Sequence, residues 1–200
     1  VEPSQFDPAK AYIAVDRHLL GDEKPYIYKT QDYGKNWTLL STEANGIPSD
    51  HSTRVLREDP KTPGLLYLGT EYGIFISFDD GKSWKSFQQN LPITPITDII
   101  LHRGDLVLST MGRGFWILDN VSALRDSKIT ALGEDPVLFK PEDTYRYRTP
   151  WGSGDFPNYP STGVGIDYYL PQDYKSGVSI EILDSGKNTV ATIVSDSTQL

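Results

Sequence analysis

The chain has 200 residues and carries 27 acidic side chains against 19 Lys and Arg, which gives a net charge of −8. This balance argues against binding to nucleic acids or anionic lipids, because neutralising their phosphates needs clustered Lys and Arg. Cysteine is absent, which excludes disulfides and thiolate metal sites, and no apolar run approaches the roughly 20 residues of a membrane-spanning helix. The many aromatic residues, together with 17 Gly and 14 Pro, favour β-strands separated by tight turns.

Two near-identical octets mark an internal repeat in the first half of the chain. They span residues 30–37 and 77–84, and both have the pattern [S/T]-x-D-x-G-x-x-W. Each follows an aromatic-rich strand and precedes a short strand that ends in an Ile-Pro or Leu-Pro turn. The shared positions are Thr30, Asp32, Gly34 and Trp37 in the first copy, and Ser77, Asp79, Gly81 and Trp84 in the second.

The residue types of the octet have the chemistry of a hairpin turn. The Asp side chain accepts hydrogen bonds from backbone N–H groups of its own turn, and the Ser or Thr hydroxyl holds the start of the turn. The Gly supplies a positive φ. The Trp is expected to anchor the returning strand in the core between neighbouring sheets. We therefore interpret the octet residues as structural rather than catalytic.

The strands predicted around the octets form units of four. In the second unit they cover residues 53–58, 65–70, 73–78 and 83–88. A third unit keeps strands at 96–101, 106–110 and 114–118 but has no octet after them. A four-stranded unit of about 40 to 50 residues is typical of a propeller blade. The sequence thus predicts an all-β chain in which residues 1–123 form about three blades of a partial β-propeller, with the remaining blades supplied by the same or another chain.

Two further regions are predicted after the blades. Residues 124–163 form a connector with a short helix or a surface segment near Arg125, a short strand between Pro136 and Pro141, and a long aromatic loop. Residues 164–200 contain strands at 164–170, 178–183 and 189–194, which indicate the start of a β-sandwich.

The octets resemble the bacterial neuraminidase (BNR, or Asp-box) repeat. Over about residues 1–148, segments such as Arg57-Glu58-Asp59-Pro60 and Gly112-Arg113-Gly114-Phe115-Trp116 resemble bacterial sortilin-like propeller proteins, often labelled BNR-repeat glycosyl hydrolases. The last region resembles the immunoglobulin-like modules that follow such propellers. The resemblance implies an extracytoplasmic bacterial protein, a recognition or scaffold propeller that binds a peptide, protein or glycan. The alternative is a xyloglucanase-like glycoside hydrolase whose active site is completed by other blades.

Candidate binding residues lie in two places. One turn contains Glu71 and Tyr72, and another contains Arg113. The two turns join matching strands of adjacent units, so they are expected on one rim. There Arg113 either meets a ligand or forms an ion pair that links two blades. Trp151, Phe156 and Tyr159 of the long loop either stack on a sugar or hold the loop against the domain.

No catalytic residue is assigned from the sequence. Glu71 and Asp98 are the candidates for the paired carboxylates that a glycoside hydrolase needs. The arginine triad of sialidases is not found. The three histidines, at 18, 51 and 102, lack metal-ligand spacing, and neither a metal nor a cofactor is expected.

Overall fold

The computed structural model describes residues 1–144, 163–172, 174 and 177–194. Its first part consists of three antiparallel sheets in which the strand order follows the chain. The first sheet contains β1 (Glu2–Pro3), β2 (Ala11–Val15), β3 (Tyr26–Thr30) and β4 (Thr38–Leu39). The second contains β5 (Thr53–Glu58), β6 (Leu66–Thr70), β7 (Ile74–Ser77) and β8 (Lys85–Ser86). The third contains β9 (Ile96–His102), β10 (Asp105–Thr110) and β11 (Phe115–Leu118).

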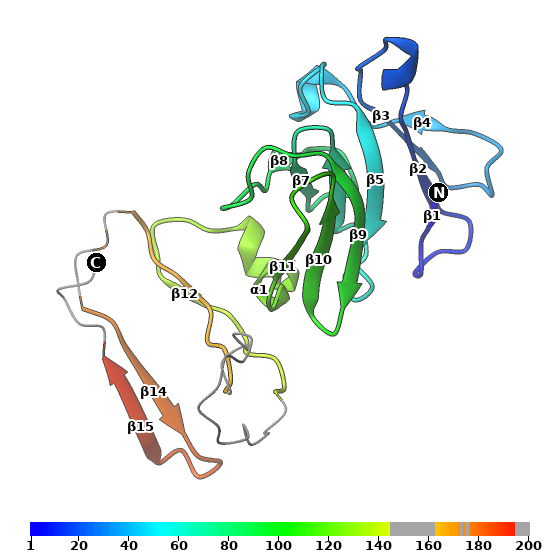
Figure 1. Ribbon diagram of the computed structural model, residues 1–200. Coiled ribbons are helices and arrows are strands. Elements are labelled where there is room, and N and C mark those ends of the chain that lie inside the picture. Colours follow the sequence, from blue (N-terminus) through cyan, green and yellow to red (C-terminus); the bar gives the residue numbers. More distant parts are fainter. Residues whose placement is uncertain (145–162, 173, 175–176, 195–200) are drawn as a thin grey trace, which may run out of the picture.

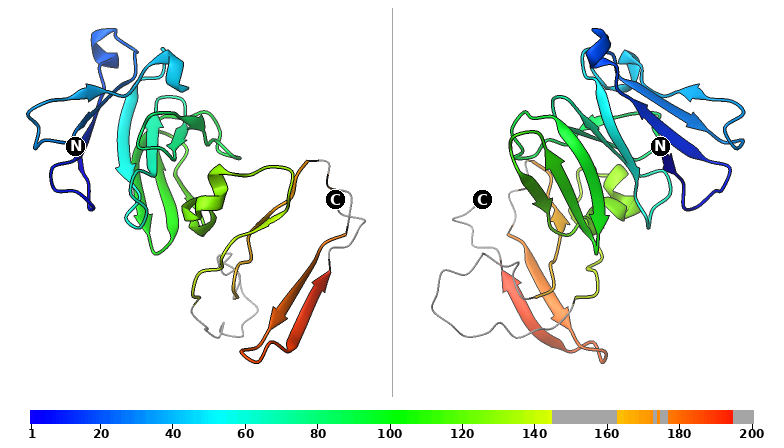
Figure 2. Two further views of the ribbon diagram at one scale, coloured as in Figure 1. Left: turned by 180° about the vertical axis from the view of Figure 1, so that it is seen from behind. Right: turned by 45° about the vertical axis from the view of Figure 1, so that its right-hand side comes forward.

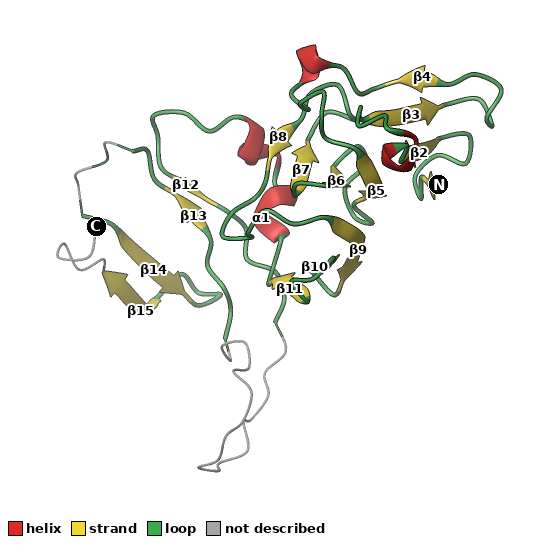
Figure 3. Cartoon of the chain, turned by 45° about the horizontal axis from the view of Figure 1, so that its top comes forward, coloured by secondary structure: helices red, strands yellow, loops and turns green. Residues whose placement is uncertain are grey.

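These three sheets pack face to face in chain order, and their first strands lie next to one another (Figures 1 and 3). Successive meanders of up to four strands, packed face to face around their first strands, are the blades of a β-propeller. The prediction of an all-β chain that begins with about three such blades is therefore confirmed. The first strand of the first blade is short, and the third blade has three strands in the described residues.

The second sheet is buried on both faces because it lies between the other two. Neighbouring residues of a strand point to opposite faces. Accordingly, Leu66 and Leu68 pack against the first sheet, whereas Tyr67 between them packs against the third sheet. All residues of β6 and β7 are buried. The hydrophobic core of the blades is thus divided into two layers, one at each contact between sheets.

The two octets form hairpin turns with the same hydrogen bonds. In the second octet, the Asp79 carboxylate accepts bonds from the Ser83 amide at 2.8 Å, the Ser83 hydroxyl at 2.6 Å and the Ser77 hydroxyl at 2.9 Å. The Gly81 amide donates to the Ser77 hydroxyl. Asp32 has the equivalent acceptor role in the first octet. The glycine has a positive φ in both turns, 82° for Gly34 and 83° for Gly81.

The two octet tryptophans differ in burial. Trp84 is 4 % exposed and packs in the apolar layer between the first and second sheets. Trp37, which was also expected in a core, is 39 % exposed. Since Trp84 packs toward the preceding blade, the repeat directs Trp37 to the outer face of the first sheet, and no described sheet covers that face. The prediction for Trp37 is wrong for this reason.

Replacing Asp79 by alanine is expected to lower the free energy of unfolding by about 1 to 3 kcal/mol, because amide and hydroxyl donors of the turn lose their acceptor. Urea unfolding of the variant measures the change. The control is alanine at Glu23, an exposed loop acid, which should change stability by less than about 0.5 kcal/mol. Equal effects of the two variants would contradict a turn-holding role for Asp79.

Short helices connect the strands. They are the 3-10 helices η1 (His18–Leu20), η2 (Glu43–Asn45) and η3 (Ser127–Thr130), and the α-helix α1 (Ser122–Arg125). The last two coincide with the short helix predicted near Arg125. Arg125 of α1 is held against the second sheet by the buried Asp59 carboxylate, 3.0 Å away. None of the helices in the described residues has the length and apolarity needed to cross a bilayer.

The C-terminal part forms two small ladders. β12 (Val137–Leu138) pairs with β13 (Tyr168–Tyr169), and β14 (Ser179–Leu183) pairs with β15 (Thr189–Val194) in a separate hairpin (Figure 2). The strand predicted at 164–170 is thus limited to two residues and pairs with the connector. The residues of β14 and β15 are almost all exposed. The immunoglobulin-like module and the domain boundaries at 123 and 163 stay predictions.

Candidate functional site

The first strands of the three blades line a polar cleft. β1, β5 and β9 lie next to one another, and the cleft between them encloses about 240 Å³. This volume is below the 300 to 1,000 Å³ of typical small-molecule sites, so the cleft suits one portion of a larger ligand. Its charged side chains come from all three strands and are Glu2, Arg54, Arg57 and Asp98.

Arg57 connects the three first strands. From β5 its guanidinium donates to the Asp98 carboxylate at 2.6 Å and to the Ile99 carbonyl at 3.0 Å, both on β9. It also lies 3.5 Å from the Glu2 carboxylate on β1. A guanidinium has several donors in a fixed plane, which suits it to bridge acceptors on different strands. Arg57 therefore fixes the position of Asp98, whose side chain is still 48 % exposed to the cleft.

A second cluster lies at the rim, where β2 ends and β5 begins. The Arg54 guanidinium donates from Nε to the Glu71 carboxylate at 2.6 Å and forms a further ion pair with it through Nη2. Asp16 lies 4.0 Å from Arg54 and accepts a hydrogen bond from the His18 ring at 2.7 Å. Partial burial opposes ionisation, but the hydrogen bonds from His18 lower the pKa of Asp16 below its ordinary value. We call Asp16, His18, Arg54 and Glu71 the rim cluster.

Three residues of the rim cluster are of types that can bind a metal ion. One ligand atom from each of Asp16, His18 and Glu71 lies within 4.8 Å of the other two. This grouping could not be predicted from the sequence, because His18 and Glu71 are far apart in the chain. The positive charge among these groups is, however, the Arg54 guanidinium, bonded directly to Glu71. The rim cluster is accordingly described as an ion-pair network, and no metal is assigned to it.

The turns predicted to share a rim lie at matching places in their blades, although the turn that contains Arg113 is one residue longer. Glu71 and Tyr72 lie between Thr70 and Gly73, and the Thr70 amide bonds the Gly73 carbonyl at 2.8 Å. The turn that contains Arg113 is closed by the equivalent bond, from Thr110 to Gly114. Because β6 and β10 have the same place in adjacent blades, both turns emerge at the same end of their sheets.

The side chains of these turns have separate partners. Glu71 pairs with Arg54, and the Tyr72 ring lies 4.6 Å from the ring of His51. The Arg113 guanidinium has no ion pair among the described residues, so the expected link to a neighbouring blade is not formed by that part of the chain. Trp151, Phe156 and Tyr159 lie outside the described residues, and their roles stay predictions.

Both carboxylates considered for hydrolysis bind arginines. Glu71 is engaged by Arg54 and Asp98 by Arg57. A glycoside hydrolase uses one carboxyl group as a proton donor and the other as a nucleophile or base. The arrangement seen here instead gives two ion pairs that hold strands and turns in place. No described pair of carboxylates has been assigned a catalytic role.

A buried network at the opposite end of β2 and β5 was also missed by the sequence analysis. Lys10 donates to Glu58 at 2.9 Å, and the Tyr12 hydroxyl bonds both Glu58 and Asp80. Burial opposes ionisation of Asp80, but hydrogen bonds from Tyr12 and Lys29 lower its pKa below the ordinary value. The pKa of the Tyr12 hydroxyl is raised, mainly by burial. The network links the first two blades.

No protein family model and no curated protein matches the chain. Among solved structures, the GH74 enzyme of Niastella koreensis is similar over 60 % of this chain and 20 % of its own length, with 13 % identity and a TM-score of 0.47. A structure titled YCF48 bound to D1 peptide is similar over 48 % of this chain and 30 % of its own, with 20 % identity and a TM-score of 0.36. Both are β-propeller proteins. The chain therefore spans less than a third of the length of either structure.

Proposed function

We propose that the cleft along β1, β5 and β9 binds an extended segment of another polypeptide, and that the chain is the recognition part of a β-propeller rather than an enzyme. The observation that carries this proposal is the state of Asp98. Its Oδ1 atom is held by Arg57 and by the Ile99 amide, at 2.6 and 2.8 Å. Its Oδ2 atom has no partner among the described residues, and the side chain is half exposed in the cleft.

A carboxylate that is fixed in place but has a free oxygen is suited to accept a hydrogen bond from a ligand. Backbone amides and cationic side chains of a peptide supply such donors, and hydrogen bonds to a charged acceptor are stronger than neutral ones. Thr97 and Arg54 add further polar groups along the same strands. The one aromatic ring of the lining is that of Tyr12, which is fully buried, so the described cleft offers no face on which a sugar would stack.

Selection of a displayed random peptide library against the protein tests this proposal. We expect selected peptides to bind with the Asp98→Asn variant at least tenfold weaker than wild type, in line with about 1.5 to 3 kcal/mol for a hydrogen bond to a charged group. The control is Asp135→Asn, because Asp135 is an exposed acidic residue outside the cleft. Thermal melting of both variants separates lost binding from lost folding.

Two outcomes would overturn the proposal. One is equal binding of the selected peptides to the wild type and the Asp98→Asn variant. The other is hydrolysis of xyloglucan by the protein, which would favour the glycoside-hydrolase alternative. We also propose an extracytoplasmic location, supported by the sequence resemblance alone. Fractionation of the producing bacterium that leaves the protein in the cytoplasm would contradict this location.

A further inference from the structure

The third blade has an open edge. β11 pairs with β10, and no described strand lies on its other side. In the first and second blades this place is taken by a fourth strand, β4 beside β3 and β8 beside β7. The chain itself does not continue along β11, because it turns at Asp119–Asn120 and enters α1 at Ser122. The Val121 amide then bonds the Gly104 carbonyl at 2.7 Å, which fixes this change of direction.

Main-chain groups on this edge point outward. The Thr110 amide bonds the Gly114 carbonyl at 3.1 Å, and this bond sets the alternation of the β10–β11 ladder. By that alternation, the N–H and C=O groups of Phe115 and Ile117 point away from β10. In the second blade the residue that matches Phe115 is Ile74, whose carbonyl accepts a bond from the Phe87 amide at 2.9 Å. The edge of β11 therefore has the donors and acceptors that a further strand would use.

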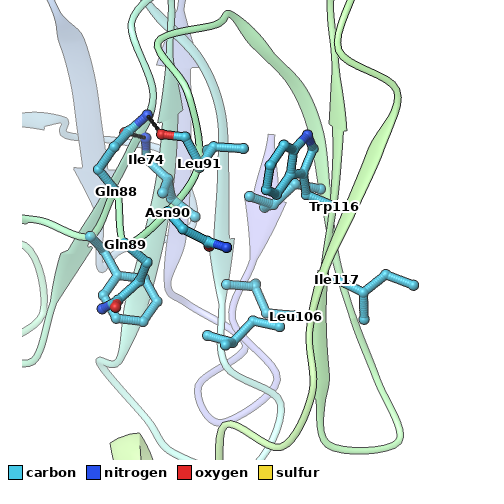
Figure 4. A pocket seen from close by; sticks show the side chains of 11 residues that line it. Ile74, Gln88, Gln89, Asn90, Leu91, Leu106, Trp116 and Ile117 are labelled. Atoms are coloured by element: carbon cyan, nitrogen blue, oxygen red, sulfur yellow. Dashed lines mark hydrogen bonds between the residues drawn. The ribbon is translucent and has the colours of Figure 1, made fainter. Parts of the chain in front are cut away.

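An apolar groove runs beside the same edge, between the second and third blades. The Trp116 ring points into the groove from β11, whereas the Ile117 side chain points away from it (Figure 4). Gln88 on the other side bonds the Leu91 carbonyl at 2.9 Å. The apolar residues of the lining are Ile74, Phe87, Leu91, Leu106, Leu108, Trp116, Ile117 and Leu118.

At the equivalent place between the first and second blades, the space is occupied by a tryptophan side chain. There Trp84 lies in one apolar cluster with Leu40, Ile47 and Leu66, and its amide bonds the Asn45 carbonyl at 2.7 Å. By the repeat, the corresponding residues in the open groove are Phe87 for Leu40, Leu91 for Ile47 and Leu106 for Leu66. The residues that line the open groove include no counterpart of Trp84.

We propose that the groove receives a β-strand of another polypeptide, which pairs with β11 and inserts one aromatic side chain of tryptophan size. A strand is favoured over a small apolar molecule because the outward N–H and C=O groups offer it a template of donors and acceptors for main-chain pairing. The aromatic side chain is required by the groove, since the equivalent place between the first and second blades holds an indole ring among equivalent apolar residues. The occupant is thus a polypeptide segment that resembles β8 and its preceding tryptophan.

A fluorescein-labelled peptide with the sequence of residues 79–88 is the probe for this proposal. We expect saturable binding to the protein by fluorescence anisotropy, and at least tenfold weaker binding of the same peptide with Trp84→Ala. Hydrogen exchange of the Phe115 and Ile117 amides should slow when the peptide binds. In the protein, Ile117→Pro should weaken binding at least tenfold, because proline removes an outward N–H group yet is tolerated on an edge strand.

Two further variants of the protein serve as a second test of the groove and as a control. Leu118→Lys, which places a charge in the groove lining, should weaken binding as well if Ile117→Pro does not fold. Ile100 lies on the opposite face of the third sheet and is 54 % exposed. The Ile100→Lys variant should therefore bind the peptide like wild type. Absence of saturable binding, equal binding of the Trp84→Ala peptide, or unchanged exchange of the two amides would overturn the proposal.

Discussion

Replacing Arg125 by methionine is expected to lower the free energy of unfolding by about 3 to 5 kcal/mol. The Arg125 guanidinium is 9 % exposed and bonds both oxygens of Asp59, whose side chain is fully buried. Methionine keeps most of the volume of the side chain but leaves the Asp59 carboxylate without a countercharge. The two remaining donors to Asp59, the amides of Lys61 and Thr62, do not replace a positive charge.

Urea unfolding followed by circular dichroism measures this change. The matched control is Arg103→Met, because Arg103 lies exposed in the turn between β9 and β10. It should change stability by less than about 0.5 kcal/mol. The double variant with Asp59→Leu should recover part of the loss, since the buried charge is then removed as well. A loss for Arg125→Met no larger than that of the control would contradict the importance of this ion pair.

The second large effect is expected at Leu68. This side chain is fully buried in the layer between the first and second blades. Alanine at this position should lower the free energy of unfolding by about 2 to 5 kcal/mol, because transfer free energy is lost and a cavity is left behind. The layer is closed from both sides by regular strands, so it has little freedom to collapse.

Ile100→Ala is the control for this substitution. Ile100 lies on the outer face of the third sheet and is 54 % exposed. Its truncation should cost less than about 1 kcal/mol, because much of the side chain is already in contact with water. Thermal and urea unfolding of both variants measure the difference. Similar losses at the two positions would mean that the first and second sheets do not pack as consecutive blades.

The strands and turns of the blades were predictable because their signals are local. The octets contain the Asp, Gly and Ser or Thr that a hairpin turn needs, and the strand predicted at 65–70 is observed as β6, Leu66–Thr70. Burial of the octet tryptophans was not predictable in the same way. Trp84 and Trp37 have the same local sequence, yet their exposure depends on whether a sheet lies against them.

The candidate site was harder to predict because its contacts join distant parts of the chain. Arg57 and Asp98 lie on different blades, and only the packing of β5 against β9 brings them together. The pairing of Arg54 with Glu71 depends likewise on a turn of the same blade folding back to the start of β5. The repeat alone predicts that Glu71, Tyr72 and Arg113 share one rim. It does not predict which residues their side chains contact.

Photo-cross-linking from position 97 tests the central claim, that ligands bind along the first strands of the blades, most directly. Thr97 is exposed on β9 and lines the cleft beside Asp98. A benzophenone amino acid at this position is expected to cross-link to the library-selected peptides, and unlabelled peptide should compete. The same amino acid at Arg103, in the turn at the other end of β9, should give no cross-link. Cross-links from position 103 and none from position 97 would contradict a binding cleft on β1, β5 and β9.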